Sequence, residues 1–281
     1  MDPFLVTTDW LAERLGAPGM AVLDCTWFVP EMKKSGYDVF AAGHIPGAQF
    51  VDLNKVSDPD SPYVNMMPAA DLFAAEIGRL GVDNDTLVIV YNANYVSARL
   101  WWMFRHFGHE KVRILDGGMP RWQAEGRPVE TGAAAPATPK TFRAAPPPAD
   151  IVQAEDVLAA ISADSATIID LRPVGRFNGT ESSGYPGVPS GHMPKSVNIP
   201  WTAFVDDTPE RRFLSPEAVR AVLEKAGVDL GRPIISTCGS GVTAAILAMQ
   251  LERMGKHDWR IYDGSWHEWG QRADLPKETS V

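Results

Sequence analysis

One cysteine in this chain lies where a nucleophile could be activated. Cys238 follows an apolar, β-leaning run, residues 234–237, and a helix-forming run from Ala244 to Met254 comes soon after it. A loop with two glycines joins the two runs and consists of Gly239, Ser240, Gly241, Val242 and Thr243. The sequence therefore predicts a strand, a tight turn and a helix, with the sulfur at the turn.

Glycine accepts backbone angles that a β-carbon forbids, so this loop can direct several N–H groups at one point. The start of the helix adds partial positive charge there. Both effects stabilise a thiolate and lower the pKa of a cysteine. A lone cysteine after a strand is more often a small buried hydrophobe, but a core cysteine does not need a polar, glycine-rich turn after it. We therefore interpret Cys238 as a nucleophile.

Two classes of enzyme place a cysteine at the head of such a loop. Tyrosine-phosphatase-like enzymes need an arginine six residues later to hold phosphate in a bidentate fork, and Ala244 stands there. Sulfurtransferases need no such arginine, because their cysteine attacks a sulfur atom and carries it as a persulfide. The loop favours sulfur transfer.

The run CGSGVTA, residues 238–244, resembles the active-site loop of the rhodanese superfamily, and within it the loop of the 3-mercaptopyruvate sulfurtransferases. Thiosulfate-specific rhodaneses usually carry two bulkier residues after the cysteine, the second of them basic. The resemblance extends over nearly the whole chain. It implies a persulfide on Cys238, held by the loop from Gly239 to Thr243, with no metal and no organic cofactor.

An internal repeat divides the chain. Four motifs of the first half recur in the same order in the second half, 146 to 148 residues later. The matched residues are Asp24 and Asp170, His44 and His192, Val96 and Val242, and Asp116 and Asp263. We predict a tandem duplication of one α/β fold, with a domain at residues 1–130, an Ala- and Pro-rich linker at 131–150 and a domain at 151–281.

Strand patterns alternate with helical patterns in each half, which predicts two mainly parallel sheets flanked by helices, as in tandem rhodanese-like domains. Ligands bind such sheets at the carboxyl ends of the strands, where the Cys238 loop would lie. The repeat places Asn92 opposite Cys238, so we expect the first domain to be inactive and to serve as a wall of the pocket. Cys25, without a glycine loop, is interpreted as structural.

Composition limits the class of protein. The 281 residues carry 45% hydrophobic and 22% charged residues, as in soluble globular proteins, and the net charge is −9. This charge argues against nucleic acid and anionic membrane surfaces as partners. Only two cysteines are present, and no secretory signal or membrane-spanning apolar run is visible, so we expect a cytoplasmic enzyme.

The resemblance also implies roles for residues near the nucleophile. Arg176, in DLRPVGRFNGTE, matches the arginine that binds the carboxylate or sulfite end of the donor, whereas Arg172 is nearer the strand and could be an internal ion-pair partner. Ser240 is expected to face the substrate, and Thr243 either does so or caps the helix. The repeated His44 and His192 are interpreted as turn-holding residues.

The sequence departs from the mercaptopyruvate enzymes at three positions. Tyr185 stands where they carry a second carboxylate-binding arginine. Asn54 and Asn65 stand at the two places where they carry a His and an Asp, which are proposed to form a proton relay with the loop serine. Asparagine cannot take up a proton near neutral pH, so the relay cannot operate in that form. What replaces it, and the oligomeric state, are not fixed by the sequence.

We therefore expect a sulfurtransferase that moves sulfur from 3-mercaptopyruvate through Cys238 to a thiol, such as thioredoxin or a low-molecular-weight thiol, or to cyanide. Two alternatives stay open. The donor could be thiosulfate, or the chain could be a persulfide carrier or protein-binding module whose partner supplies the sulfur.

Overall fold

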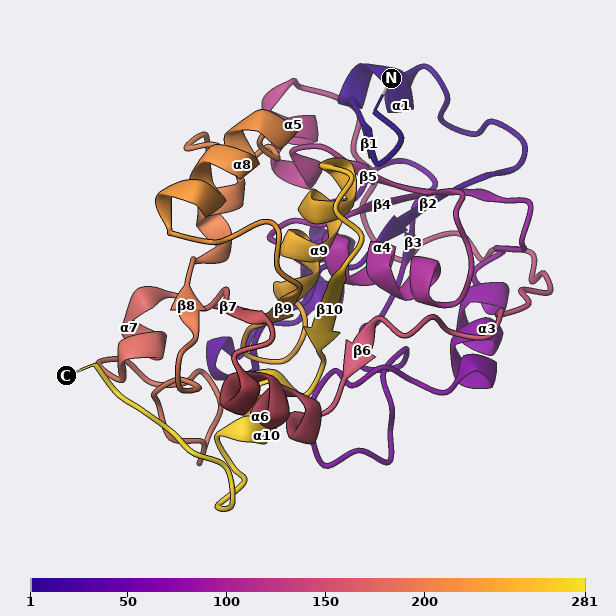
Figure 1. Cartoon of the computed structure of the whole chain (residues 1–281). Coiled ribbons are helices and arrows are strands. Elements are labelled where there is room, and N and C mark those ends of the chain that lie inside the picture. The colour runs from indigo at the N-terminus through magenta and orange to yellow at the C-terminus, as the bar shows by residue number, and fades with distance from the viewer. Residues whose placement is uncertain (1, 281) are drawn as a thin grey trace.

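Two parallel sheets, one in each half of the chain, form the framework of the protein (Figure 1). The computed structural model describes residues 2–280. The strand orders are β1-β5-β4-β2-β3 and β6-β10-β9-β7-β8, so the second sheet repeats the first, strand for strand. All pairings within these two sheets are parallel. The predicted α/β duplication is confirmed.

Short helices connect the strands in both domains. The elements of the first domain are β1 (Leu5–Val6), α1 (Thr8–Ala12), β2 (Met20–Asp24), the 3-10 helix η1 (Pro30–Met32), α2 (Gly36–Ala42), β3 (Gln49–Phe50), α3 (Ala70–Arg79), β4 (Leu87–Tyr91), α4 (Ser97–His106), β5 (Val112–Leu115) and α5 (Gly118–Ala124). The elements of the second domain are β6 (Ile151–Val152), α6 (Ala154–Ala163), β7 (Thr167–Asp170), α7 (Val174–Asn178), β8 (Val197–Asn198), the 3-10 helix η2 (Trp201–Phe204), α8 (Pro216–Lys225), β9 (Ile234–Thr237), α9 (Ala244–Arg253), β10 (Trp259–Tyr262) and α10 (Ser265–Trp269).

The two domains meet through their central helices, α4 and α9, which pack against each other (Figure 1). Residues 244–251 of α9 are all buried, and in α4 only Arg105 is not. Each of these helices is covered on both sides, because it lies between its own sheet and the other domain. The helix α9 ends at Arg253, and Gly255 follows in the left-handed conformation, with φ +75°.

The segment between the domains contains no helix and no strand, as its proline content predicts. It lies along the first domain. The Lys140 N–H donates to Gly78 O and the Ala145 N–H to Phe107 O, both at 2.9 Å. Phe142 is buried in contact with the ring of Phe73, which anchors the segment to the core.

The two repeated histidines occupy equivalent structural positions, which confirms their interpretation as turn-holding residues. His44 Nδ1 lies 3.0 Å from Phe40 O, and His192 Nδ1 lies 2.9 Å from Phe177 O. In both cases the imidazole stacks on that phenylalanine, with ring centroids 3.9 Å apart. The same geometry in both domains shows that these residues serve the fold.

Candidate active site

Cys238 lies at the carboxyl end of the central strand β9, where the chain turns into α9. The sulfur-bearing residue is 2% exposed. The N–H groups of Cys238 and Gly241 both donate to Ser265 Oγ at 3.1 Å, and Ser265 Oγ donates to Tyr262 O at 2.8 Å. The start of α10 adds a further bond, from the Trp266 N–H to Cys238 O at 3.0 Å. The loop is thereby held in one conformation.

The two glycines of the loop are there because nothing larger fits. Gly241 has φ +73°, and a β-carbon on it would lie 2.4 Å from a carboxylate oxygen of Asp263. A β-carbon on Gly239 would lie 2.8 Å from the hydroxyl of Tyr185. The predicted backbone angles are confirmed for Gly241 only; Gly239 has no positive φ, and its lack of a side chain instead leaves room for the Tyr185 hydroxyl.

Four N–H groups of the loop have no acceptor among residues 2–280. They belong to Gly239, Ser240, Val242 and Thr243. The Gly241 N–H, by contrast, is used by Ser265 and stabilises the loop itself. Unpaired N–H groups at the start of a buried helix favour the binding of an anion. A thiolate or persulfide on Cys238 would be such an anion.

The equivalent loop of the first domain is built differently. Asn92, which the repeat aligns with Cys238, accepts a hydrogen bond from the Ser97 N–H through its own Oδ1 at 2.7 Å. Its carbonyl accepts from the Met119 N–H at 3.0 Å, which corresponds to the bond between Trp266 and Cys238. The Asn92 side chain thus takes one N–H of the helix start, and the loop presents no nucleophile.

Ser240 lies at the centre of a buried hydrogen-bond network. Its Oγ accepts from the Tyr185 hydroxyl at 2.8 Å and from Asn65 Nδ2 at 3.0 Å. All three side chains are buried, and burial raises the pKa of Tyr185, so its hydroxyl stays protonated. Two of the positions that depart from the mercaptopyruvate enzymes are thus brought together on the loop serine. Asn54, the third, is exposed.

A cavity of about 170 Å³ opens onto Cys238. The second domain supplies the nucleophile loop, Tyr185 and two arginines, and the first domain supplies a largely apolar wall. That wall consists of Trp27, Val29, Met32 and Tyr95. No carboxylate lines this cavity among the described residues. The pocket is therefore cationic although the chain as a whole carries −9.

The two arginines of the cavity have different environments. Arg172 is 2% exposed and is bound by Asp170, to whose carboxylate it donates from both Nε and Nη2. Arg172 is therefore an internal ion-pair partner, as the sequence analysis allowed. The Arg176 side chain is 24% exposed, and its contact with Glu31 of the first domain is long, at 3.4 Å. Arg176 is the cation that is available to a ligand.

Beneath the loop, an ion pair joins the two domains. Arg99 of α4 and Asp263 are both buried and in direct contact. Arg99 also donates to the carbonyls of Asn65 and Gly241, and Asp263 Oδ2 accepts from the Met67 N–H at 2.6 Å. This arrangement ties the segment that carries Asn65 to the segment that carries Cys238.

Two of these residues, Ser265 and Arg99, were not identified from the sequence. Ser265 follows the repeated Asp-Gly motif at the position that Gly118 holds in the first half, so the difference between the repeats was a usable signal. Arg99 lies in a tryptophan-rich helix and gives no sign in the sequence of a partner 164 residues away.

Neither a metal centre nor a membrane span is found in the part of the chain that the structure describes. Residues 2–280 contain no group of three or more His, Cys, Asp or Glu side chains that could hold a metal ion. None of the helices in that range combines the length and the apolar character that crossing a bilayer requires.

A comparison with known protein families identifies both halves of the chain. The Rhodanese-like domain matches the chain twice, at residues 7–125 and 153–272. The chain belongs to the rhodanese family. Each matched range of this rhodanese contains most of one of the two sheets, from the first helix of its domain to the last.

The relatives of this chain include two kinds of named sulfurtransferase. The human 3-mercaptopyruvate sulfurtransferase is 42% identical over 277 residues, which cover 96% of this chain and 92% of that protein. The bovine thiosulfate sulfurtransferase is 40% identical over 286 residues, covering 99% and 94%. The crystal structure of SseA from Escherichia coli, a 3-mercaptopyruvate sulfotransferase, superimposes with a TM-score of 0.84 at 36% identity, covering 94% of this chain and 98% of that one.

Proposed function

We propose that this protein is a sulfurtransferase that takes sulfur from 3-mercaptopyruvate and passes it to a thiol acceptor or to cyanide. The observation that carries the proposal is Cys238, a nucleophile at the start of a buried helix, in a cavity whose available cation is Arg176. The relatives named as sulfurtransferases over nearly the full chain support it.

In the first half-reaction, the Cys238 thiolate attacks the sulfur of 3-mercaptopyruvate. A sulfur–sulfur bond forms, the carbon–sulfur bond breaks, and its electron pair leaves on the enolate of pyruvate. The proton of the donor's thiol leaves the outer sulfur to water, so the persulfide is left as an anion. The enolate needs a proton. Asn65 has no basic group, and burial keeps Tyr185 protonated, so we propose that the Ser240 and Tyr185 hydroxyls pass a proton from water to the enolate.

The persulfide that remains on Cys238 is stabilised by the unpaired N–H groups of Gly239, Ser240, Val242 and Thr243. In the second half-reaction an acceptor removes the outer sulfur and restores the thiolate, which gives a double-displacement scheme with ping-pong kinetics. We propose a low-molecular-weight thiol or thioredoxin as the acceptor and a cytoplasmic location, which the two free cysteines support.

Thiosulfate is the second candidate donor. Tyr185 and Asn65 stand where the mercaptopyruvate enzymes carry a second arginine and a residue of the proton relay. The bovine relative, which covers 99% of this chain, is named thiosulfate sulfurtransferase. With thiosulfate the same attack releases sulfite, which needs no proton.

Parallel steady-state assays decide between the two donors. One assay follows pyruvate from 3-mercaptopyruvate, and the other follows sulfite from thiosulfate, each with cyanide as the acceptor. A higher kcat/KM with 3-mercaptopyruvate is expected. A higher kcat/KM with thiosulfate would reassign the donor, and no turnover of either would favour the persulfide-carrier alternative.

Replacing Arg176 by methionine is expected to raise KM for the donor by about tenfold to a hundredfold, with a smaller effect on kcat. A hydrogen bond to a charged group contributes about 1.5–3 kcal/mol, and the guanidinium is held only by its long contact with Glu31. Arg220→Met, on the exposed side of α8, is the matched control and should leave KM unchanged. An unchanged KM in Arg176→Met would remove this residue from donor binding.

Replacing Tyr185 by phenylalanine is expected to lower kcat/KM for 3-mercaptopyruvate about fivefold. The change removes one of the two hydrogen bonds that Ser240 accepts, worth about 1 kcal/mol, and keeps the ring that packs beside Gly239. With thiosulfate, whose product needs no proton, the effect should be smaller. An equal loss with both donors would argue against the proton path through this hydroxyl.

A further inference from the structure

His267 lies beside the two hydrogen-bond donors of Ser240, and the reaction as proposed above does not use it. This histidine belongs to the short helix α10 and is half-buried. Its own N–H donates to Gly239 O at 2.8 Å, so the backbone at this position helps to hold the nucleophile loop. The imidazole makes two further contacts, one with Tyr185 and one with the segment that carries Asn65.

The first contact of the imidazole is with an aromatic ring. The ring centroids of His267 and Tyr185 are 4.8 Å apart and the ring planes meet at 68°, which is an edge-to-face arrangement. Tyr63 of the first domain contacts the imidazole in the same manner, with centroids 6.1 Å apart. Because the Tyr185 hydroxyl donates to Ser240, the histidine supports the ring that carries this donor.

The second contact joins the imidazole to the first domain. The Val64 N–H donates to His267 Nδ1 at 3.3 Å, and Gln271 Nε2 lies 3.4 Å from the same nitrogen. A backbone N–H can only donate, so Nδ1 is the unprotonated nitrogen of the ring. Burial lowers the pKa of His267 below its ordinary value, which keeps the ring neutral and this nitrogen available near neutral pH.

Asn65, which follows Val64, needs support from its neighbours because its backbone is in the left-handed region. Its φ is +60°, an uncommon angle for a residue with a β-carbon. The segment is anchored by the Val64 N–H before it and the Met67 N–H after it, and Arg99 donates to the Asn65 carbonyl. Loss of the first anchor would free Asn65 Nδ2 to turn away from Ser240 Oγ, 3.0 Å from it.

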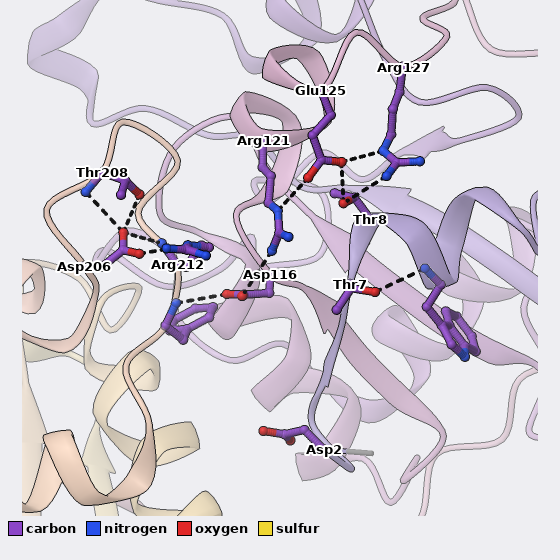
Figure 2. A network of polar contacts seen from close by, with 12 residues as sticks. Asp2, Thr7, Thr8, Asp116, Arg121, Glu125, Arg127, Asp206, Thr208 and Arg212 are labelled. Carbon is purple, nitrogen blue, oxygen red and sulfur yellow. Dashed lines mark hydrogen bonds and ion pairs between the residues drawn. The ribbon is translucent and has the colours of Figure 1, made fainter.

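The two repeats differ at the position of this histidine. The repeat aligns His267 with Pro120 of α5, which has neither an N–H to donate nor a side-chain nitrogen to accept. The next residue, Arg121, donates to Glu125 at 2.9 Å within the first domain (Figure 2). A histidine thus occupies this position only in the repeat that contains the nucleophile, unlike the turn-holding histidines that both repeats contain.

We propose that His267 is a positioning residue that keeps Tyr185 and Asn65 directed at the loop serine while the enolate is protonated. The proposal rests on the sulfurtransferase function above, and the proton path is unchanged, from water through the two hydroxyls to the enolate of pyruvate. With both acceptor positions of its oxygen filled, the Ser240 hydroxyl is left with its own proton to direct, and it can turn that proton toward the enolate.

Asparagine and leucine at position 267 have nearly the same shape, so they isolate the acceptor. Both variants lose the ring, but His267→Asn keeps an oxygen near the place of Nδ1 that can accept from the Val64 N–H. We expect kcat/KM for 3-mercaptopyruvate to fall about fivefold to tenfold in His267→Leu and no more than about threefold in His267→Asn. In a double-displacement scheme this quantity reports on the first half-reaction alone, to which the proton transfer belongs.

The ratio of kcat/KM between the two donors separates positioning from general damage to the fold. Thiosulfate releases sulfite, which needs no proton, so its kcat/KM should fall less than about twofold in His267→Leu. The ratio does not depend on how much of the protein is folded. Arg121→Met, in the equivalent helix α5, breaks the contact with Glu125 and is the structural control, in which the ratio should equal that of the parent protein.

Three results would overturn the positioning role and leave the proposed function intact. They are a kcat/KM for 3-mercaptopyruvate in His267→Leu equal to that of the parent protein, equal values in His267→Leu and His267→Asn, and an equal loss with both donors. A parent protein that forms no pyruvate from 3-mercaptopyruvate would overturn the proposed function, and the role of His267 with it.

Discussion

Replacing Cys238 by serine is expected to lower sulfur transfer at least about a thousandfold with either donor. A serine hydroxyl at this position is not ionised near neutral pH and cannot carry sulfane sulfur, so the double-displacement path is closed. The fold should be kept, because the residue is held through its backbone by Ser265 and Trp266 and the side chains are of similar size.

The chain supplies its own control in Cys25. This thiol is fully buried, donates to Tyr91 O at 3.3 Å, and has a pKa raised by burial. Cys25→Ser should retain activity. After treatment with donor alone, mass spectrometry should find one extra sulfur atom on the parent protein and on Cys25→Ser, and none on Cys238→Ser. Sulfur bound to Cys25, or turnover that survives in Cys238→Ser, would contradict the mechanism.

Replacing Arg99 by methionine is expected to lower the free energy of unfolding by about 3–5 kcal/mol. Removing one partner of a buried ion pair leaves the other charge without compensation, and both Arg99 and Asp263 are within 1% of complete burial. Denaturant unfolding measures the loss. Arg79→Met breaks an exposed pair of 2.8 Å with Glu76 and should change stability by less than about 1 kcal/mol.

A double variant keeps this prediction testable if Arg99→Met folds poorly. Arg99→Met combined with Asp263→Asn removes the stranded charge while keeping an oxygen for the Met67 N–H, so part of the lost stability should return. If the double variant is less stable than Arg99→Met alone, the pair does not act as a coupled unit, and the cause of the destabilisation lies in the other contacts of Arg99.

Local and periodic features of this protein could be read from its sequence. The near-constant spacing of the repeated motifs predicted two copies of one fold, and the strand expected at residues 234–237 has those bounds in the structure. The loop at Cys238 could be recognised because its glycines and its helix are contiguous. These features depend on residues a few positions apart, where propensity and pattern carry information.

Contacts between the domains could not be predicted in this way. Asn65 Nδ2 donates to Ser240 Oγ across 175 residues of sequence, and nothing in the sequence around either residue indicates this contact. Matching family positions placed Asn54 beside Asn65 in function, yet the structure leaves Asn54 exposed. Side chains that meet through tertiary structure need the fold before they can be paired.

The two equivalent loops differ in how the backbone at the start of their helix is used. At Asn92 the loop meets the N–H of Ser97 with its own side chain, as a helix start ordinarily does. At Cys238 the same turn keeps four N–H groups unpaired for a ligand, and needs Ser265 from another helix to keep its shape. The copy at Asn92 presents no nucleophile. The other copy remains a receptor for charge, and for that reason its loop should become more rigid when sulfur is bound and be the first part of the site to open when it is not.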